Sequence, residues 1–390
     1  MEKFDVAVVG AGISGCATAF ALAKTGASVI ILDRFGPAAM ASGWTLAGVR
    51  QSGRDPAELP LAMAAVKIWQ TLHEELGAPT RYVQRGNLRL ARDAAEYQQL
   101  HNMVRQQANS GLDLTFLPDN AAIREIAPAI SSEIPGASFC ASDGHADPQT
   151  TSAAYIATLE RLGVTLAMGE VVERIEVVGG KAAGLRTSNR SIAADSVVLT
   201  AGVFTNSLLE PLGLNVPLET PMVAVVRTAP VAPILEQVIG VVGGDWAGRQ
   251  ETNGRLRLTS GALPWNGTME TVVTADGPRP KIRPPLSSLR AIIDKAELLL
   301  PGLSDAAIDD CWSGLLDLTP DALPVLDHAP GIDGLVVGMG FSGHGFCLGP
   351  VTGHILCDLA TGNTPAHDLS AFGFDRFSGI HTKTEPALHG

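Results

Sequence analysis

The sequence predicts an α/β protein with two interleaved domains, one built from βαβ units and the other on a mixed or antiparallel sheet. Four observations lead to this class. A glycine-spaced turn near the N-terminus lies between an apolar run and a helical segment, and apolar runs ending in small residues recur near residues 195–202 and 334–338. Residues 217–324 are rich in strand-like segments and turns, and 390 residues exceed what one hydrophobic core usually serves.

The glycine-spaced turn comprises Gly10, Gly12 and Gly15, with a predicted buried strand over residues 5–9 and a predicted helix over residues 16–25. Gly10 allows the tight strand-to-helix turn, and Gly12 lets a pyrophosphate approach bare backbone. Gly15 lets the helix pack closely against the strand. This arrangement is typical of a Rossmann-like nucleotide-binding site.

A second apolar run, residues 28–32, ends at Asp33. In Rossmann-like units an acid about twenty residues beyond the turn accepts hydrogen bonds from a ribose. A glycine-rich turn without a ligand is the alternative, but it leaves an acid at the strand end unexplained. The turn and Asp33 therefore predict a bound adenine dinucleotide, without separating NAD from FAD.

Later segments return to this first domain. Residues 148–162 are predicted as a helix, residues 171–187 as a hairpin, and residues 350–360 as a final helix. The predicted boundaries place the first domain on residues 1–50, 145–216 and 325–375, and the second on residues 51–144 and 217–324.

Composition excludes several classes of protein. A net charge of −12 argues against a nucleic-acid surface, which needs a basic stripe. The five cysteines are odd in number and scattered, so neither a disulfide framework nor a metal site is expected. The sequence has no run of about eighteen uncharged apolar residues, so we expect no membrane span. We also expect no secretory leader, because no basic segment precedes the first strand. We expect a cytoplasmic protein that binds no metal.

Further landmarks follow in chain order: the loop 42–50, residues 144–148 before a helix, Val172 with Ile175, and residues 197–202, 318–324 and 338–346. With the N-terminal turn they cover nearly the whole chain. The sequence resembles the FAD-dependent amine oxidoreductases of the D-amino acid oxidase, glycine oxidase and sarcosine oxidase superfamily. It looks closest to the flavin subunits of opine or hydroxyproline oxidases and dehydrogenases. The resemblance makes the first domain FAD-binding and the second substrate-binding.

The glycine-rich segment 338–346 favours a flavin on physical grounds as well. Its backbone N–H groups and the N-terminus of the following helix would stabilise the negative charge of a reduced isoalloxazine, and Gly343, Gly345 and Gly349 permit close approach to a flat ring. An ordinary mobile loop is the alternative. The turn and the resemblance together imply non-covalent FAD held by Gly10, Gly12, Ile13, Ser14, Gly15, Asp33, Arg34, Ser42, Thr45, Val172, Ala201, Gly202, Gly340, Gly343, His344, Gly345, Phe346 and Cys347.

Few catalytic groups are needed to oxidise an amine at its α carbon, because positioning supplies most of the effect. Arg50 matches the family position that binds a substrate carboxylate, and an arginine fork suits that group. A surface-exposed Arg50 is the alternative, with Arg54 nearby. His344 is expected to hydrogen-bond the substrate or tune the flavin, unless it is a packed loop histidine. Gln250 and Arg257 are further candidates for the substrate pocket.

The chain departs from the sarcosine oxidase pattern in four places. Cys347 replaces a lysine, which argues against sarcosine itself, and Leu46 stands near the place of an arginine beside the flavin. Arg257 replaces the lysine associated with oxygen activation, so a dehydrogenase with another acceptor is open. Gly314 occupies the position of the flavinylated cysteine, with Cys311 three residues away, which implies non-covalent FAD.

The predicted function is oxidation of the C–N bond of an amino acid by hydride transfer to flavin N5. A secondary or N-substituted substrate, such as a sarcosine-, opine-, proline- or hydroxyproline-like compound, is favoured. Three alternatives remain: a D-amino acid or glycine oxidase acting on primary amines, the flavin subunit of a larger dehydrogenase that needs a partner chain, and a nucleotide-binding protein without catalysis.

Overall fold

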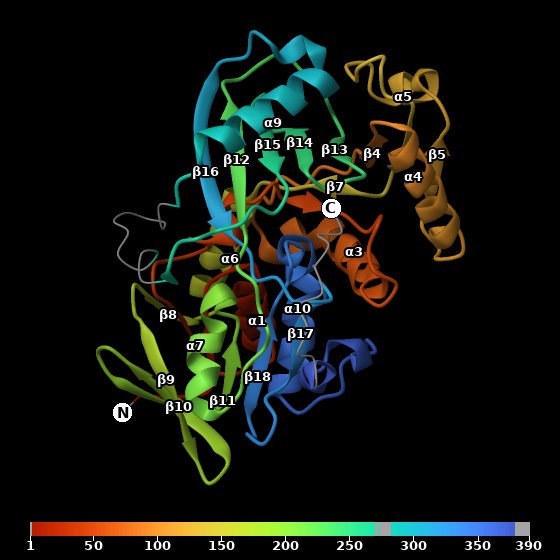
Figure 1. Ribbon diagram of the computed structural model, residues 1–390. Helices are drawn as coiled ribbons and strands as arrows, with labels where there is room; N and C mark the ends of the chain where they lie inside the picture. Colours follow the sequence, from red (N-terminus) through yellow and green to blue (C-terminus); the bar gives the residue numbers. More distant parts are fainter. Residues whose placement is uncertain (1, 270–271, 273–281, 379–390) are drawn as a thin grey trace.

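The computed structural model describes residues 2–269, 272 and 282–378. Two eight-stranded sheets occupy different parts of the molecule (Figure 1). The first is largely parallel and the second largely antiparallel, which confirms the predicted α/β class with two kinds of sheet. Among the described helices, none has the length and apolar character needed to cross a lipid bilayer.

The first sheet contains β1 (Glu2–Val9), β2 (Val29–Asp33), β8 (Thr165–Met168), β9 (Val172–Val178), β10 (Lys181–Thr187), β11 (Ser191–Leu199), β17 (Val325–His328) and β18 (Leu335–Met339). Its main order is β17-β18-β11-β1-β2-β8, and β9 and β10 form a hairpin beside β11. β1 pairs in parallel with β2 and β11. Its apolar residues alternate between two cores, as strand geometry requires: Val6 and Val8 face one, Ala7 and Val9 the other.

Helices α1 (Ile13–Lys24), α3 (Leu59–Leu76), α6 (Pro148–Arg161) and α10 (Gly345–Ala360) form the core on one face of this sheet. The closest approach lies between α1 and α10. A Cβ built on Gly349 would lie 2.7 Å from Ile13 Cγ1, and one on Gly353 would lie 2.5 Å from the carbonyl carbon of Ala17. Gly349, expected to approach a flat ring, therefore serves helix packing.

The second sheet contains β4 (Asn87–Ala91), β5 (Leu114–Leu117), β6 (Gly136–Cys140), β12 (Met222–Thr228), β13 (Val238–Val241), β14 (Trp246–Gln250), β15 (Leu256–Ser260) and β16 (Ile308–Leu315). Its order is β16-β12-β15-β14-β13-β4-β6-β5, with β13 and β4 as its parallel pair. Helix α9 (Leu286–Leu299) lies across it (Figure 1), and Trp246 Nε1 donates to Ile292 O at 3.1 Å. The remaining short elements are α2 (Ala41–Trp44), β3 (Gly48–Val49), α4 (Ala94–Gln107), α5 (Asn120–Ile126), β7 (Gly144–His145) and α7 (Thr205–Leu209).

One segment belongs to a different core from the one we predicted. Residues 51–144 were assigned to the second domain, but the buried face of α3 packs with α1 and α10. Trp69 Nε1 also donates to Cys347 O at 2.8 Å. The reason is the amphipathic pattern of α3, whose apolar stripe places Leu61, Val66 and Trp69 in that core.

The carboxyl ends of four strands meet at one edge of the first sheet. Gly10 follows β1, Asp33 ends β2, Thr200 follows β11, and Gly340 follows β18. Open α/β sheets bind ligands beyond the carboxyl ends of their strands. The fold thus gathers motifs that are up to 330 residues apart in the sequence at the edge that faces the second sheet.

Candidate functional site

Two adjoining cavities lie at this edge. The larger, about 300 Å³, lies between the glycine-rich loop after β18 and the second sheet, and the smaller, about 130 Å³, lies over the ends of β1 and β2. Residues lining both cavities are Gly12, Ala41, Ser42, Thr200, Gly202, Leu315 and Asp317. An elongated ligand can therefore pass from one cavity to the other along the N-terminus of α1.

The glycine turn after β1 is as crowded as its spacing predicts. A Cβ on Gly15 would lie 1.9 Å from Gly10 O, and one on Gly10, at a φ of +105°, would lie 2.4 Å from Thr200 O. Gly12 precedes the first turn of α1 without a side-chain cap, and Ser42 Oγ accepts a hydrogen bond from Ile13 N at 3.1 Å. The turn leaves helix N–H groups directed at the cavity, which suits a phosphate.

Asp33 is tied to the turn. Its Oδ2 accepts from Ala11 N at 2.9 Å, and its Oδ1 accepts from Phe35 N at 2.8 Å and Gly36 N at 2.9 Å. A carboxylate offers about four lone-pair sites, so a ribose hydroxyl can still donate to it. Arg34, Val172, Ala201 and Gly202 also line the smaller cavity, and the Arg34 guanidinium stacks 4.1 Å from the centre of the Phe204 ring.

The glycine-rich loop forms one wall of the larger cavity. Gly340 and Gly343 have positive φ, and so does Ser342 at 52°, a conformation that favours glycine. Asp317 anchors the loop, because its Oδ2 accepts from Gly340 N at 2.8 Å and its O accepts from Ser342 N at 3.1 Å. Burial raises the pKa of the Asp317 carboxyl to about 6. His344, Gly345 and Phe346 continue the wall at the start of α10.

His344 is held by a buried carboxylate that the sequence analysis did not single out. Its Nδ1 lies 2.9 Å and 3.0 Å from the two carboxylate oxygens of Glu58. Burial and Arg54 lower the pKa of His344 to about 4. Burial alone would raise the pKa of Glu58, but His344 and Arg54 lower it to about 2. At neutral pH a neutral imidazole donates from Nδ1 to the Glu58 carboxylate, which leaves Nε2 as a hydrogen-bond acceptor.

Arg50 lies half-buried in the wall of the larger cavity, not on the outer surface. Its Nη1 donates to Ser52 O at 2.8 Å. The turn after it is fixed by buried Asp143, which accepts from Gln51 N at 2.8 Å and from Ser52 Oγ at 2.5 Å. Burial together with Arg54 and Arg89 lowers the pKa of Arg50 well below its usual value. The guanidinium therefore favours an anionic ligand.

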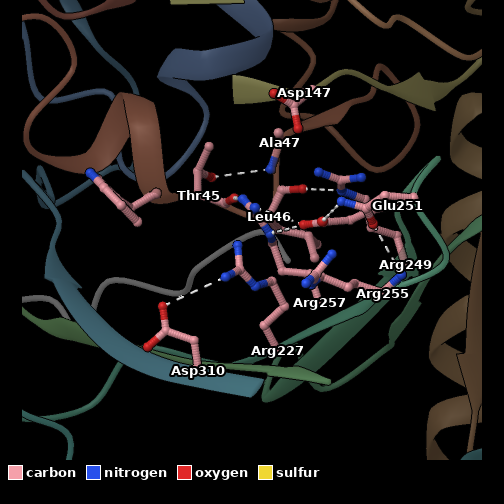
Figure 2. Close-up of polar contacts among 12 residues, drawn as sticks. Thr45, Leu46, Ala47, Asp147, Arg227, Arg249, Glu251, Arg255, Arg257 and Asp310 are labelled. Atoms are coloured by element: carbon pink, nitrogen blue, oxygen red, sulfur yellow. Dashed lines mark hydrogen bonds and ion pairs between the residues drawn. The ribbon is translucent and has the colours of Figure 1, made fainter. Parts of the chain in front are cut away.

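Side chains of the second sheet form a clamp on the backbone of residues 44–46 (Figure 2). Three successive carbonyl oxygens accept side-chain hydrogen bonds: Trp44 O from Trp312 Nε1 at 2.9 Å, Thr45 O from Arg257 Nη1 at 2.6 Å, and Leu46 O from Arg249 Nε. Arg257 is buried and forms an ion pair with Glu251 at 2.7 Å. The clamp fixes Thr45 and Leu46, which line the larger cavity.

Two predicted pocket residues are not brought to the cavity wall. Gln250 Oε1 accepts from Ile234 N at 2.8 Å and Leu235 N at 3.1 Å, while its Nε2 donates to three backbone carbonyls. Those bonds use its amide inside the second domain. Arg257 acts on the cavity through Thr45 O, so its place is behind the wall.

The thiols near the cavity differ in their surroundings. Cys347 is buried, its Sγ donates to Arg50 O at 3.4 Å, and burial raises the pKa of the thiol to about 11. It is therefore a packing residue. Gly314 lines the larger cavity, whereas Cys311 is exposed on the outer side of β16. The described residues contain no group of three or more His, Cys, Asp or Glu side chains placed to hold a metal ion.

The chain is similar to known oxidoreductases along nearly its whole length. The profile of the family described as "FAD dependent oxidoreductase" (DAO) matches residues 5–359. Peroxisomal sarcosine oxidase of Mus musculus is 28% identical over 395 residues, covering 97% of each chain. Glycine oxidase of Geobacillus kaustophilus is 27% identical over 388 residues, covering 97% of this chain and 98% of that protein. The crystal structure of that organism's glycine oxidase matches with a TM-score of 0.88 at 24% identity, over 96% of this chain and 99% of the other.

Proposed function

The chain belongs to the DAO family of FAD-dependent oxidoreductases, and we propose that it oxidises the C–N bond of a secondary or N-substituted amino acid. Membership makes it an FAD-dependent amino acid oxidase or dehydrogenase. The observation that carries the finer proposal is the larger cavity, where Arg50 and the neutral His344 lie beside the glycine-rich loop. These groups match a carboxylate and an amine on one small molecule.

The residues along both cavities fit FAD. Asp33, which has one lone-pair site still available, suits a ribose, and the N-terminus of α1, where Gly12 provides no side-chain cap, suits the pyrophosphate. The glycine-rich loop, the start of α10, Ser42 and Thr45 all line the larger cavity, which would take the isoalloxazine. Gly314 offers no side chain for attachment, which supports non-covalent binding.

Bound FAD supplies the acceptor for the two electrons that leave the substrate as a hydride. Arg50 binds the carboxylate and so orients the α carbon. His344 Nε2 accepts a hydrogen bond from the substrate N–H, and Glu58 keeps the imidazole in the tautomer that can do so. Backbone N–H groups at the start of α10, which no side chain caps, stabilise negative charge that develops at the cavity wall.

We propose a cytoplasmic location, since all five cysteines are free thiols and four of them are buried. We also propose that a partner chain can accept the electrons, because one relative, 24% identical, is the beta subunit of a sarcosine oxidase of Rhizobium meliloti. The same experiment that identifies the substrate class tests this dependence.

Anaerobic flavin bleaching tests the proposal directly. Purified holoenzyme is mixed with sarcosine, proline and 4-hydroxyproline isomers, opines, glycine and D-amino acids, with acetate as an unreactive carboxylate control. We expect bleaching by the N-substituted class, and admission of air then separates an oxidase from a dehydrogenase by the rate of recovery. Reduction by glycine or primary D-amino acids alone would contradict the proposal. A bound flavin that none of these compounds reduces, even with a dye as electron acceptor, would also overturn it.

A further inference from the structure

Three arginines, Arg50, Arg54 and Arg89, line the larger cavity beside His344. Arg50 and Arg54 come from the segment after β3, and Arg89 comes from β4 of the second sheet. Arg54 Nε donates to Arg50 O at 3.2 Å. A Cβ built on Gly53 would lie 3.0 Å from Arg89 Nη1, so the Arg89 guanidinium lies directly against the turn that carries the other two.

The described residues leave much of this donor capacity unused. Arg54 is only 6% exposed, and its buried Nη1 has no hydrogen-bond partner among them. Within the same part of the chain, the Arg89 side chain donates to Met103 Sδ at 3.9 Å and forms no ion pair. An arginine carries five N–H donors, and leaving a buried guanidinium unpaired is costly. Such groups indicate an anionic ligand.

The two nearby carboxylates, Asp143 and Glu58, bind other groups. Asp143 accepts from Gln51 N, Ser52 N and Ser52 Oγ, which fixes the turn after Arg50. Glu58 pairs with His344 Nδ1. Arg54 and Arg89 also repel each other: burial and the charge of Arg54 lower the pKa of Arg89 to about 10. This lowering is a further sign of excess positive charge. Arg54 and Arg89 therefore carry N–H donors that neither Asp143 nor Glu58 accepts.

One carboxylate cannot satisfy all three guanidinium groups. It has two oxygens with about four lone-pair sites, and a bidentate arginine fork already occupies both oxygens. The family resemblance assigns the α-carboxylate to Arg50. Arg54 and Arg89 are left for a different acidic group of the same molecule.

We propose that Arg54 and Arg89 form a second anion subsite, and that the substrate is an imino diacid, an amino acid whose nitrogen carries a carboxyalkyl group. This inference rests on the proposed function and names its substrate class. A hydride leaves the α carbon for FAD and a proton leaves the nitrogen, which forms a C=N bond. Water then adds to that carbon and the C–N bond breaks, giving a 2-oxo acid and a primary amino acid.

Matched ligands that differ by one carboxylate test the subsite in the oxidised holoenzyme. Oxydiacetate and methoxyacetate share an ether but lack an amine, so neither is oxidised, and binding is read from the perturbed flavin absorbance. A charge-assisted contact predicts that oxydiacetate binds about ten- to hundredfold more tightly. Equal affinities would overturn the inference.

Variants locate the effect. Arg89→Met should abolish the advantage of oxydiacetate and leave methoxyacetate binding unchanged, and Arg89→Lys, which keeps the charge but loses the fork, should retain part of it. Arg85→Met, at an exposed arginine just before β4, is the control and should match wild type. An advantage that survives in Arg89→Met would refute the assignment, and unchanged thermal unfolding of the holoenzyme excludes a folding defect.

The substrate class is tested by anaerobic reduction with iminodiacetate against sarcosine, which again differ by one carboxylate. We expect half-saturation at a concentration about ten- to hundredfold lower for iminodiacetate. Reduction by both with equal half-saturation would refute the inference and leave the proposed function standing. Tight, Arg89-dependent binding of oxydiacetate without reduction by any amine would refute the proposed function and leave the anion subsite standing.

Discussion

Glu58→Gln is the sharpest single test of the His344 assignment. The carboxylate of Glu58 lies 2.9 Å and 3.0 Å from His344 Nδ1 in a buried setting, so the bond is charge-assisted. Such bonds contribute about 1.5–3 kcal/mol, compared with about 0.5–1.5 kcal/mol for a neutral pair. Glutamine keeps the size of the side chain but removes the charge. The loss of about 1–1.5 kcal/mol predicts a fall of about five- to thirteenfold in the limiting rate of flavin reduction.

The fall is larger if the glutamine amide turns its N–H toward Nδ1, because the imidazole must then carry its proton on Nε2 and cannot accept from the substrate. Anaerobic stopped-flow measures the rate and the substrate half-saturation separately. Glu96→Gln, which removes a carboxylate paired with Arg92 at the start of α4, controls for loss of a structural ion pair. A Glu58→Gln rate within twofold of wild type at pH 7 would refute the acceptor role of His344.

Three further variants test other parts of the structure. The pKa of Asp317 is about 6 in the folded protein, above the ordinary value of 3.8, so the stability of the apoprotein should fall as the pH rises from about 4 to 6. Asp317→Asn should raise the free energy of unfolding at pH 7 by up to about 3 kcal/mol and have no such effect below pH 4. Gly353→Ala should destabilise the protein by about 1–3 kcal/mol in urea titrations, because its Cβ would overlap α1, whereas Gly302→Ala, with open space around it, should stay within about 0.5 kcal/mol of wild type. Arg257→Met and Glu251→Met should each cost about 3–5 kcal/mol by leaving a buried charge unpaired, and the double variant should cost less than their sum; strict additivity would show that the two side chains do not interact.

The glycine turn and Asp33 could be predicted as a nucleotide-binding site because the residues that form it are close together in the sequence. Three glycines, one strand on each side of a helix and an acid at the second strand end lie within the first 33 residues. Gly10 and Gly15 each have a steric reason that nearby backbone supplies, such as the 1.9 Å approach of a Gly15 Cβ to Gly10 O. Gly349 shows the limit of that reasoning, because a glycine required by helix packing and one required by a ligand look alike in a sequence.

The larger cavity around His344 was less predictable, because the residues that meet there are far apart in the sequence. Glu58 and His344 are separated by 286 residues, and Glu58 lies on the segment leading into a helix that we assigned to the other domain. Arg89 looks like an ordinary polar residue of an amphipathic strand. No local pattern marks either residue. The signal that could have found Arg54 was its spacing of four residues from Arg50, which places two guanidinium groups on one tight turn.

The clamp of Figure 2 links the packing of the two domains to the shape of the cavity. Burial and Arg257 lower the pKa of Arg249 to about 9, and the same two arginines, after burial itself, lower the pKa of His145 to about 3. Holding two guanidinium groups this close is unfavourable unless their donors are used. The carbonyls of Thr45 and Leu46 use them, so the wall of the cavity compensates the buried charge of the second sheet. A change that loosens this contact must therefore also move Thr45 and Leu46 in the wall of the cavity that His344 lines, which couples stability to substrate positioning.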